Sequence, residues 1–208
     1  MKPTYTLEDL LGSRSRIAVL RVLHGVDVPL NASQIAARTG FTAPAVISAL
    51  AGFAAMGVVR SSPAGRATVH WLSRDSVYVE NLIAPLLQAE RSIPEDLIDD
   101  LAWTFQDVAV SVVLFGSYAR GDQGPASDVD VVLVAENGAT EAALEVAAAD
   151  HAAAFRARFG ATLSYLIYTR EGARALSRTS PELAESIKRE GVVVAGMSPW
   201  EWADGAEA

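Results

Sequence analysis

Two short apolar runs mark the middle of this 208-residue chain. Residues 110–115 and 129–134 are rich in valine, and each run is too short for a helix. Runs of this length with many β-branched residues are typical of buried strands. The segment between them is polar and contains Gly121, Gly124 and Pro125, residue types that favour turns. The pattern therefore predicts two buried strands joined by a polar loop.

The rest of the second half alternates between helical and strand-like spacing. Helices are expected at residues 94–105, 140–159 and 181–190, the last capped by Ser180, and strands at residues 161–168 and 192–195. The first of these helices carries four acidic side chains, Glu95, Asp96, Asp99 and Asp100. Acidic residues are favourable near a helix N-terminus, so we expect all four to face solvent rather than to bind a metal.

Helical spacing dominates the first third of the chain. A capping-box pattern at Thr6 and Asp9 predicts a short first helix. Further helices are expected at residues 13–24 and 32–38, and a third capped by Thr42, with Pro44 near its start and Val46, Leu50 and Phe53 on its inner face. Short strands are expected at residues 58–60 and 68–72, with a loop at residues 61–67 between them. Two helices joined by a four-residue turn at residues 39–42 form a helix-turn-helix pattern.

Residues 13–72 resemble the winged-helix transcription regulators, above all along SQIAARTGFTAPAVISALAGFAAMGVVR. In such folds the third helix enters the major groove of DNA and the hairpin contacts the phosphate backbone. Five positions of the third helix are expected to point outward: Thr42, Ala43, Ala45, Ser48 and Ala49. We predict that Thr42 and Ser48 on this helix, with Arg60 and Arg66 on the hairpin, contact double-stranded DNA. The alternative is a winged helix that serves protein contact or dimerisation.

The charge distribution favours the DNA-binding interpretation. The chain carries a net charge of -8. Residues 1–75 nevertheless hold eight Lys and Arg against four acidic residues, whereas the remainder holds nine against twenty-one. A basic first third on an acidic protein indicates that this part alone meets a polyanion.

Composition narrows the cellular context. The absence of cysteine excludes disulfides and thiolate metal sites, and three scattered histidines do not suggest a zinc cluster. Acidic residues interrupt the N-terminal segment early, unlike a signal peptide, and no apolar run approaches the roughly 20 residues of a membrane span. We therefore expect a cytoplasmic protein without a membrane segment.

The chemistry of the central stretch depends on an aspartate pair. Asp128 and Asp130 are two residues apart at the mouth of the second strand, so they project to the same face. Two neighbouring carboxylates repel unless a cation lies between them, and Mg²⁺ prefers such hard oxygen ligands. Upstream, Gly116 allows a close approach of the backbone and Ser117 offers donors to phosphate. This pattern predicts a magnesium–triphosphate site, and the alternative is a turn with a solvated Asp-x-Asp.

The segment GSYARG, followed by SDVD, resembles the signature of the minimal nucleotidyltransferases of the DNA polymerase beta superfamily. The resemblance implies a small mixed sheet with flanking helices, binding of Mg²⁺-ATP and transfer of a nucleoside monophosphate to an acceptor hydroxyl. It also implies that Gly116 and Ser117 hold the triphosphate, while Asp128 and Asp130 hold the metal as catalytic residues. Arg120 either contacts the triphosphate or covers the loop.

One element of that family pattern is missing. The resemblance implies a third carboxylate in the middle of a later strand, which here is the strand at residues 161–168. Neither face of this strand carries an acid, and Ser164 is expected in the corresponding place. Glu136 shares a face with Asp130 but lies about 20 Å further along the strand. Glu171 follows the third strand and could return only if the chain folds back.

Together these patterns predict an α+β protein with two domains. A winged-helix domain is expected at residues 1–75, a linker helix at 76–93, the nucleotidyltransferase domain at 94–196, and a tail at 197–208. The linker helix is also a surface on which a homodimer could form. Three functions stay open: a nucleotidyltransferase, a transcription regulator whose second domain is an inactive nucleotide sensor, and an antitoxin-like protein-contact scaffold.

Overall fold

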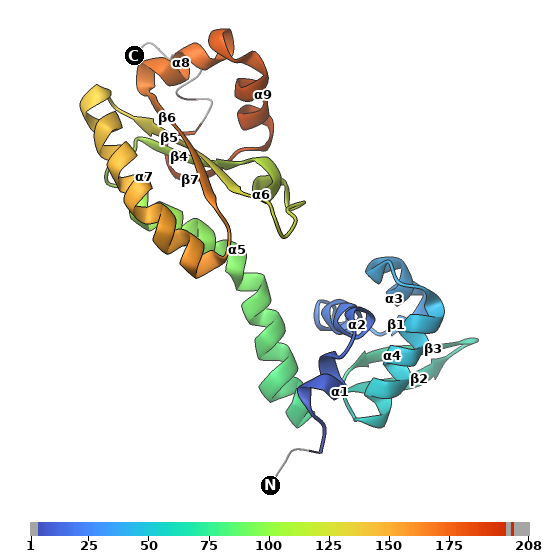
Figure 1. The fold of residues 1–208 in the computed structure, drawn as a ribbon. Coiled ribbons are helices and arrows are strands. Elements are labelled where there is room, and N and C mark those ends of the chain that lie inside the picture. The colour runs from blue at the N-terminus through green and yellow to red at the C-terminus, as the bar shows by residue number, and fades with distance from the viewer. Residues whose placement is uncertain (1–3, 199–200, 202–208) are drawn as a thin grey trace. The chain divides into compact units, whose positions relative to one another are not determined.

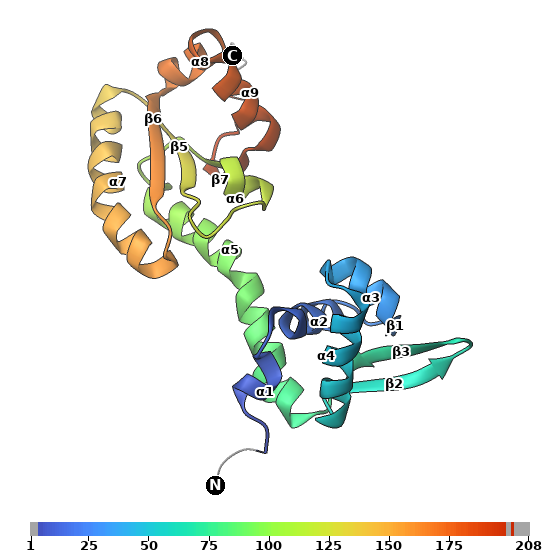
Figure 2. The same ribbon diagram turned by 45° about the vertical axis from the view of Figure 1, so that its right-hand side comes forward.

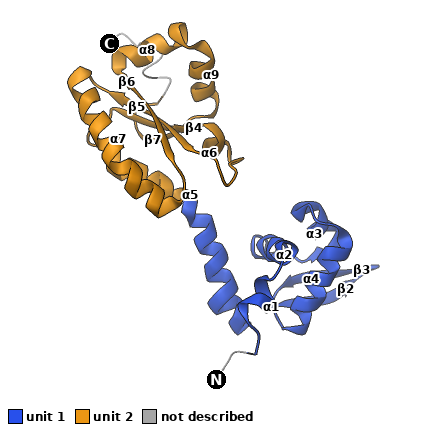
Figure 3. Cartoon of the chain, viewed as in Figure 1, with its two compact units in different colours: residues 1–93 blue, residues 94–208 orange. Residues whose placement is uncertain are grey.

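The computed structural model describes residues 4–198 and 201. The chain divides into two compact units, Met1–Ile93 and Pro94–Ala208, which are coloured separately in Figure 3. Most of the predicted tail, including Trp200 and Trp202, lies outside the described residues. Within the described part, no helix is both long enough and apolar enough to cross a membrane.

Four helices form most of the first unit: α1 (Leu7–Leu11), α2 (Arg14–His24), α3 (Ala32–Thr39) and α4 (Ala43–Ala55). The capping box predicted at Thr6 and Asp9 is present, and Asn31 makes another with Gln34 at the start of α3. Thr42 occupies the N-cap position of α4, but its side chain makes no capping hydrogen bond there. That part of the prediction for Thr42 was wrong, and Pro44 in the first turn favours the start of the helix instead.

A small antiparallel sheet completes the first unit. Its strands β1 (Leu30–Asn31), β2 (Val59–Ala64) and β3 (Ala67–Leu72) lie in the order β1-β3-β2. The loop predicted at residues 61–67 is wrong, because most of it is paired strand in a hairpin that projects from the helices in Figure 2. Pro63 is tolerated there because β2 is an edge strand.

The side chains of α4 are buried on one face of the helix and exposed on the other. Val46, Leu50 and Phe53 are buried as predicted. Ala49 is also buried, so its predicted outward position was wrong, whereas Ile47 is 55% exposed. The reason is the helical repeat: the apolar stripe is wide enough to include residue 49 beside residue 50.

The segment after the hairpin differs most from the prediction. The sequence suggested two separate helices, a linker helix at residues 76–93 and a second helix beginning at Pro94. Instead, a π-helical turn, η1 (Val79–Ile83), leads into one helix, α5 (Ala84–Phe105), which continues through Pro94. Proline removes one backbone hydrogen bond and disfavours a helix interior. Here apolar residues on both sides of Pro94, including Leu87 and Leu97, are buried and stabilise the helix on either side.

The second unit is built on a four-stranded mixed sheet with the order β6-β5-β4-β7. The strands are β4 (Ser111–Phe115), β5 (Val129–Ala135), β6 (Leu163–Thr169) and β7 (Val192–Gly196). Strands β5 and β6 are parallel, and β4 is antiparallel to both of its neighbours. The four predicted strands are therefore all present, with bounds shifted by at most two residues.

Helices cover both faces of this sheet (Figure 1). The second half of α5 and α7 (Gly138–Phe159) pack against one face, where Val129, Val131 and Leu133 are fully buried. Helices α8 (Arg170–Thr179) and α9 (Pro181–Glu190) pack against the other face, over Val132 and Val134. Helix α9 follows the prediction, although Ser180 makes no side-chain cap bond, whereas α8 was not predicted.

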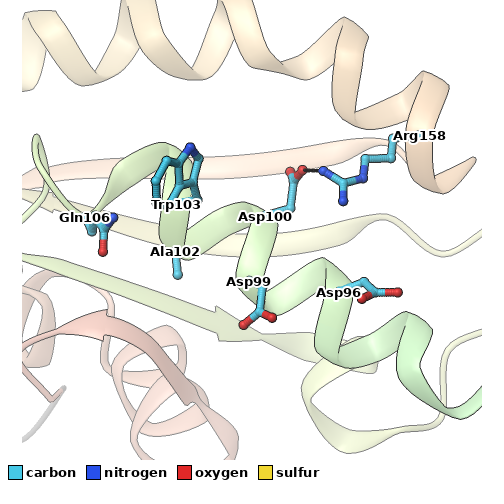
Figure 4. Close-up of a pocket in the computed structure, with 7 residues that line it drawn as sticks. All are labelled: Asp96, Asp99, Asp100, Ala102, Trp103, Gln106 and Arg158. Atoms are coloured by element: carbon cyan, nitrogen blue, oxygen red, sulfur yellow. Dashed lines mark hydrogen bonds and ion pairs between the residues drawn. The ribbon is translucent and has the colours of Figure 1, made fainter.

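The acidic face of α5 is only partly solvated. Glu95, Asp96 and Asp99 are exposed as expected. The side chain of Asp100 is only 7% exposed and accepts hydrogen bonds from Arg158 and His151 on α7, so its predicted solvent position was wrong. Figure 4 shows Asp100 turned toward Arg158, beside the exposed Trp103.

Candidate functional site

The predicted triphosphate and metal residues flank the junction between β4 and β5. The chain leaves β4 at Phe115, forms a short helix, α6 (Gly116–Arg120), and returns to begin β5 at Val129. Figure 2 shows α6 next to β5, and the two elements are in contact. Phe115 is paired with Asp130 across the antiparallel ladder. This pairing brings the Gly-Ser segment beside the aspartate pair, although α6 itself was predicted as loop.

Gly116 lies directly against Asp130. Its φ is +72°, a left-handed conformation that residues with a side chain rarely adopt. A Cβ added to Gly116 would lie 2.6 Å from Oδ2 of Asp130. The backbone conformation therefore favours glycine at this position, and a side chain here would also displace the carboxylate of Asp130. The next residue, Ser117, is partly exposed.

The two aspartates occupy different depths. Asp130 lies within β5 and is half-buried, whereas Asp128 precedes the strand and is exposed. Val129 between them is fully buried, which agrees with carboxylates that share the opposite face. Among the described residues, no group of three or more His, Asp or Glu side chains is placed to hold a metal ion. Mg²⁺ is commonly held by one or two carboxylates plus substrate phosphates, so this pair suits it when a triphosphate supplies further oxygens.

Ser164 stands beside Asp130 on the neighbouring strand. The parallel register pairs Asp130 with Ser164 and continues to pair Val134 with Tyr168. Val134 and Tyr168 both pack toward α8 and α9, so Ser164 shares the face of Asp130. The other two candidate acids lie elsewhere: Glu136, beyond the far end of β5, forms an ion pair with Arg170, and Glu171 is exposed in the first turn of α8.

Arg120 is held by two protein carboxylates. Its guanidinium lies 3.1 Å from Asp122 and 3.0 Å from Glu190 at the end of α9. The hydrogen bonds that Arg120 donates to Asp122, and then to Glu190, raise the pKa of Arg120. Glu190 also accepts a hydrogen bond from Ser186, and this bond together with Arg120 lowers the pKa of Glu190. The pairing of Glu190 with Arg120 was not predicted, because no local pattern links residues that are 70 positions apart.

The predicted DNA-contact residues lie on two elements of the first unit. Thr42 and Ser48 are exposed at the start and on the outer face of α4. Arg66 is exposed in the turn of the β2–β3 hairpin, where no strand partner constrains it. Arg60 lies on β2 and is bound to Asp75 at 2.6 Å, which neutralises part of its charge.

Sequence reasoning missed a groove between α4 and the hairpin. Seven residues line it: Asn31, Ala32, Ser33, Ile47, Ala67, Thr68 and His70. Burial lowers the pKa of His70, whose ring nitrogen lies 2.8 Å from the Ser61 hydroxyl. The exposure of Ile47 on the outer face of α4 was the signal that could have located this groove.

Comparison with known proteins bears on the second unit. A family model described as nucleotidyltransferase domain matches residues 95–193. No curated protein matches the chain. Among solved structures, one described as "Crystal structure of the toxin-antitoxin with AMP-PNP" is similar, with 18% sequence identity and a TM-score of 0.36. The similarity covers 53% of this chain and 81% of that one. The family match indicates a nucleotidyltransferase domain in the second unit.

Proposed function

We propose that the second unit binds a nucleoside triphosphate together with Mg²⁺ and transfers a nucleoside monophosphate from it to an acceptor. The observation that carries this proposal is the contact of Gly116 with Asp130, which brings a phosphate-accessible backbone next to a metal-binding carboxylate. The nucleotidyltransferase match over residues 95–193 supports it. ATP is the nucleotide that we expect.

Each residue has a defined part in this proposal. Gly116 allows the triphosphate to approach the backbone, and Ser117 donates from its hydroxyl and N–H. Asp128 and Asp130 hold Mg²⁺, which supplies charge compensation for the triphosphate when bound. Arg120, the last residue of α6, is held by Asp122 and by Glu190 of α9, and we assign it a contact with the triphosphate.

Label transfer from ATP tests the proposal. Purified full-length protein is incubated with Mg²⁺, α-labelled ATP and a cell extract. The expected result is label attached to an acceptor, with release of pyrophosphate. Tight binding of ATP without any transfer would instead support a second candidate, a nucleotide sensor. The observation that favours the sensor is Ser164, which lies beside Asp130 where the related enzymes carry a third carboxylate.

For the first unit we propose a winged-helix domain that binds double-stranded DNA and gives the protein a role in transcription regulation. The order of its elements, with α3 and α4 followed by the β2–β3 hairpin, supports this assignment. The excess of basic residues in the first 75 positions supports it too. In this proposal, α4 lies in the major groove with Thr42 and Ser48, and the hairpin meets phosphates.

Replacing Arg60 and Arg66 together by alanine is expected to weaken binding to any duplex, whatever its sequence. Each phosphate contact that is lost should lower the slope of log affinity against log salt by about 1. Titration of a labelled duplex at several salt concentrations measures this slope. The matched control removes two exposed arginines from the second unit, Arg174 and Arg178, and should leave the slope unchanged. An unaltered slope in the hairpin variant would count against the proposed contacts.

We also propose that the chain forms a homodimer through the helical segment that follows the hairpin. Leu82 and Leu86 are 41% and 50% exposed, and they are four residues apart, so they share one face. Light scattering of the full-length protein is expected to give twice the chain mass. Replacing both leucines by glutamate should reduce it to one chain. A monomer mass for the unmodified protein would contradict the proposal.

A further inference from the structure

The surroundings of Asp130 limit the chemistry of the proposed site. Its strand neighbours are Phe115 on β4 and Ser164 on β6, and Val132 follows it on the same face. Gly116 lies beside its Oδ2 on the side of α6. Apart from Asp128, these neighbours carry a phenyl ring, a hydroxyl, an isopropyl group or no side chain, and none of them accepts a proton at neutral pH.

Transfer to a neutral hydroxyl requires a proton acceptor within hydrogen-bond reach of that hydroxyl. Asp128 and Asp130 are assigned to the metal, so neither carboxylate is free to accept the proton of the hydroxyl. Ser164 is the half-buried β6 residue that is paired with Asp130, and its hydroxyl is no base at neutral pH. An acceptor oxygen that arrives ionised does not need this assistance.

We propose that the acceptor of this site is a phosphate monoester, whose oxygen arrives already ionised, and that Ser164 sets this choice. The inference rests on the proposed nucleotidyl transfer. One acceptor oxygen attacks the α-phosphorus and forms a phosphoanhydride bond. The bond between the α-phosphorus and the oxygen that bridges to the β-phosphate breaks, and pyrophosphate leaves. No proton is transferred in this step, because the second ionisation of a phosphate monoester is complete above about pH 7.

Two arginines and two carboxylates lie beside α6, and Arg189 is the arginine among them that is most open to an anionic acceptor. Arg120 and Arg189 both approach the carboxylate of Glu190, at 3.0 and 4.0 Å, where the end of α9 packs against α6. Arg120 lies four residues after Gly116 along the same helix, which places their α-carbons about 6 Å apart along the helix axis. Arg189 is 68% exposed and is therefore open to a phosphate from solvent.

The test compares two acceptors that differ only in the phosphate. Full-length protein, Mg²⁺ and α-labelled ATP are incubated with guanosine 5′-monophosphate or with guanosine. We expect labelled dinucleoside diphosphate from the monophosphate and at least about a hundredfold less product from guanosine, the range that a general base contributes. A 5′-phosphorylated oligonucleotide and its unphosphorylated counterpart show whether a nucleic-acid end also serves.

Variants of β6 and α9 test the assigned residues. Ser164→Asp should gain transfer to guanosine, and calorimetry without acceptor should show tighter Mg²⁺-dependent ATP binding, whereas Ser164→Ala should keep transfer to the monophosphate. Leu166→Asp, a carboxylate one position further on the same face, is the matched control and should gain neither. Arg189→Ala should weaken binding of guanosine 5′-monophosphate at least about threefold, the low end for a charge-assisted contact, while Arg178→Ala leaves it unchanged.

The possible failures are distinguishable. Equal product from guanosine and its monophosphate would overturn the inference, and so would Mg²⁺-dependent ATP binding without transfer to either acceptor. Neither result contradicts the proposed binding of nucleotide and Mg²⁺ by the second unit. Absence of Mg²⁺-dependent ATP binding would overturn the proposed function of the second unit.

Discussion

Replacing Asp128 and Asp130 together by alanine is expected to abolish Mg²⁺-dependent nucleotide binding by the full-length protein. In the proposed site, the carboxylates just before and at the start of β5 are the protein's oxygen ligands to the metal beside Gly116. Changing a group that merely orients a metal ligand lowers metal affinity about 10- to 100-fold, so loss of both ligands should exceed about 100-fold. Calorimetric titration with ATP in the presence of Mg²⁺ measures the change. Binding to duplex DNA should persist, because both residues belong to the second unit.

A matched control separates coordination from charge. Asp107 and Asp150 are exposed acids of the same unit, and their joint replacement by alanine makes the same change in net charge. This control variant should bind ATP as the unmodified protein does. Unchanged ATP affinity in the Asp128/Asp130 variant would refute the metal assignment, whereas equal losses in both variants would point to a general electrostatic effect.

Gly116→Ala is expected to have the second largest effect. The new Cβ would lie 2.6 Å from Oδ2 of Asp130, closer than carbon and oxygen can approach, so either the carboxylate or the backbone must move. The left-handed conformation adds about 1–2 kcal/mol for a residue with a side chain. We expect a lower melting temperature and the loss of Mg²⁺-dependent ATP binding, measured by calorimetry and thermal denaturation of the full-length variant.

Gly121→Ala is the control for backbone strain alone. Gly121 ends the same short helix with a φ of +73°, and no atom lies within 4 Å of a Cβ built on it. This variant should lose stability through the left-handed conformation but keep its nucleotide affinity. If both alanine variants lose ATP binding to the same extent, the contact between Gly116 and Asp130 has no special role.

The sheet of the second unit could be predicted because its signal is local. Buried strands require consecutive apolar residues, and β4 and β5 contain them in runs that end at polar turn residues. The alternation of side chains then places Asp130 and Ser164 on definite faces of β5 and β6. Their alignment in the parallel register depends on how far β6 slides along β5, which no local pattern determines.

Features that depend on contacts between distant parts of the sequence were not predicted. Helix α6 has five residues, too few for helical spacing to be recognised, and its Arg120 is fixed by Glu190 across a long stretch of sequence. Asp100 looked like a solvated acid because its partners His151 and Arg158 lie on another helix. Helix α8 could have been predicted from the sequence, because its buried residues Ala173 and Leu176 are three positions apart among charged residues.

Titration of ATP into the unmodified full-length protein, first with Mg²⁺ and then with the metal chelated, measures whether nucleotide binding depends on the metal. We expect saturable binding to one site per chain with Mg²⁺, and binding at least about tenfold weaker without it. Equal affinity under both conditions, or no binding under either, would contradict a metal–triphosphate site between Gly116 and the aspartate pair.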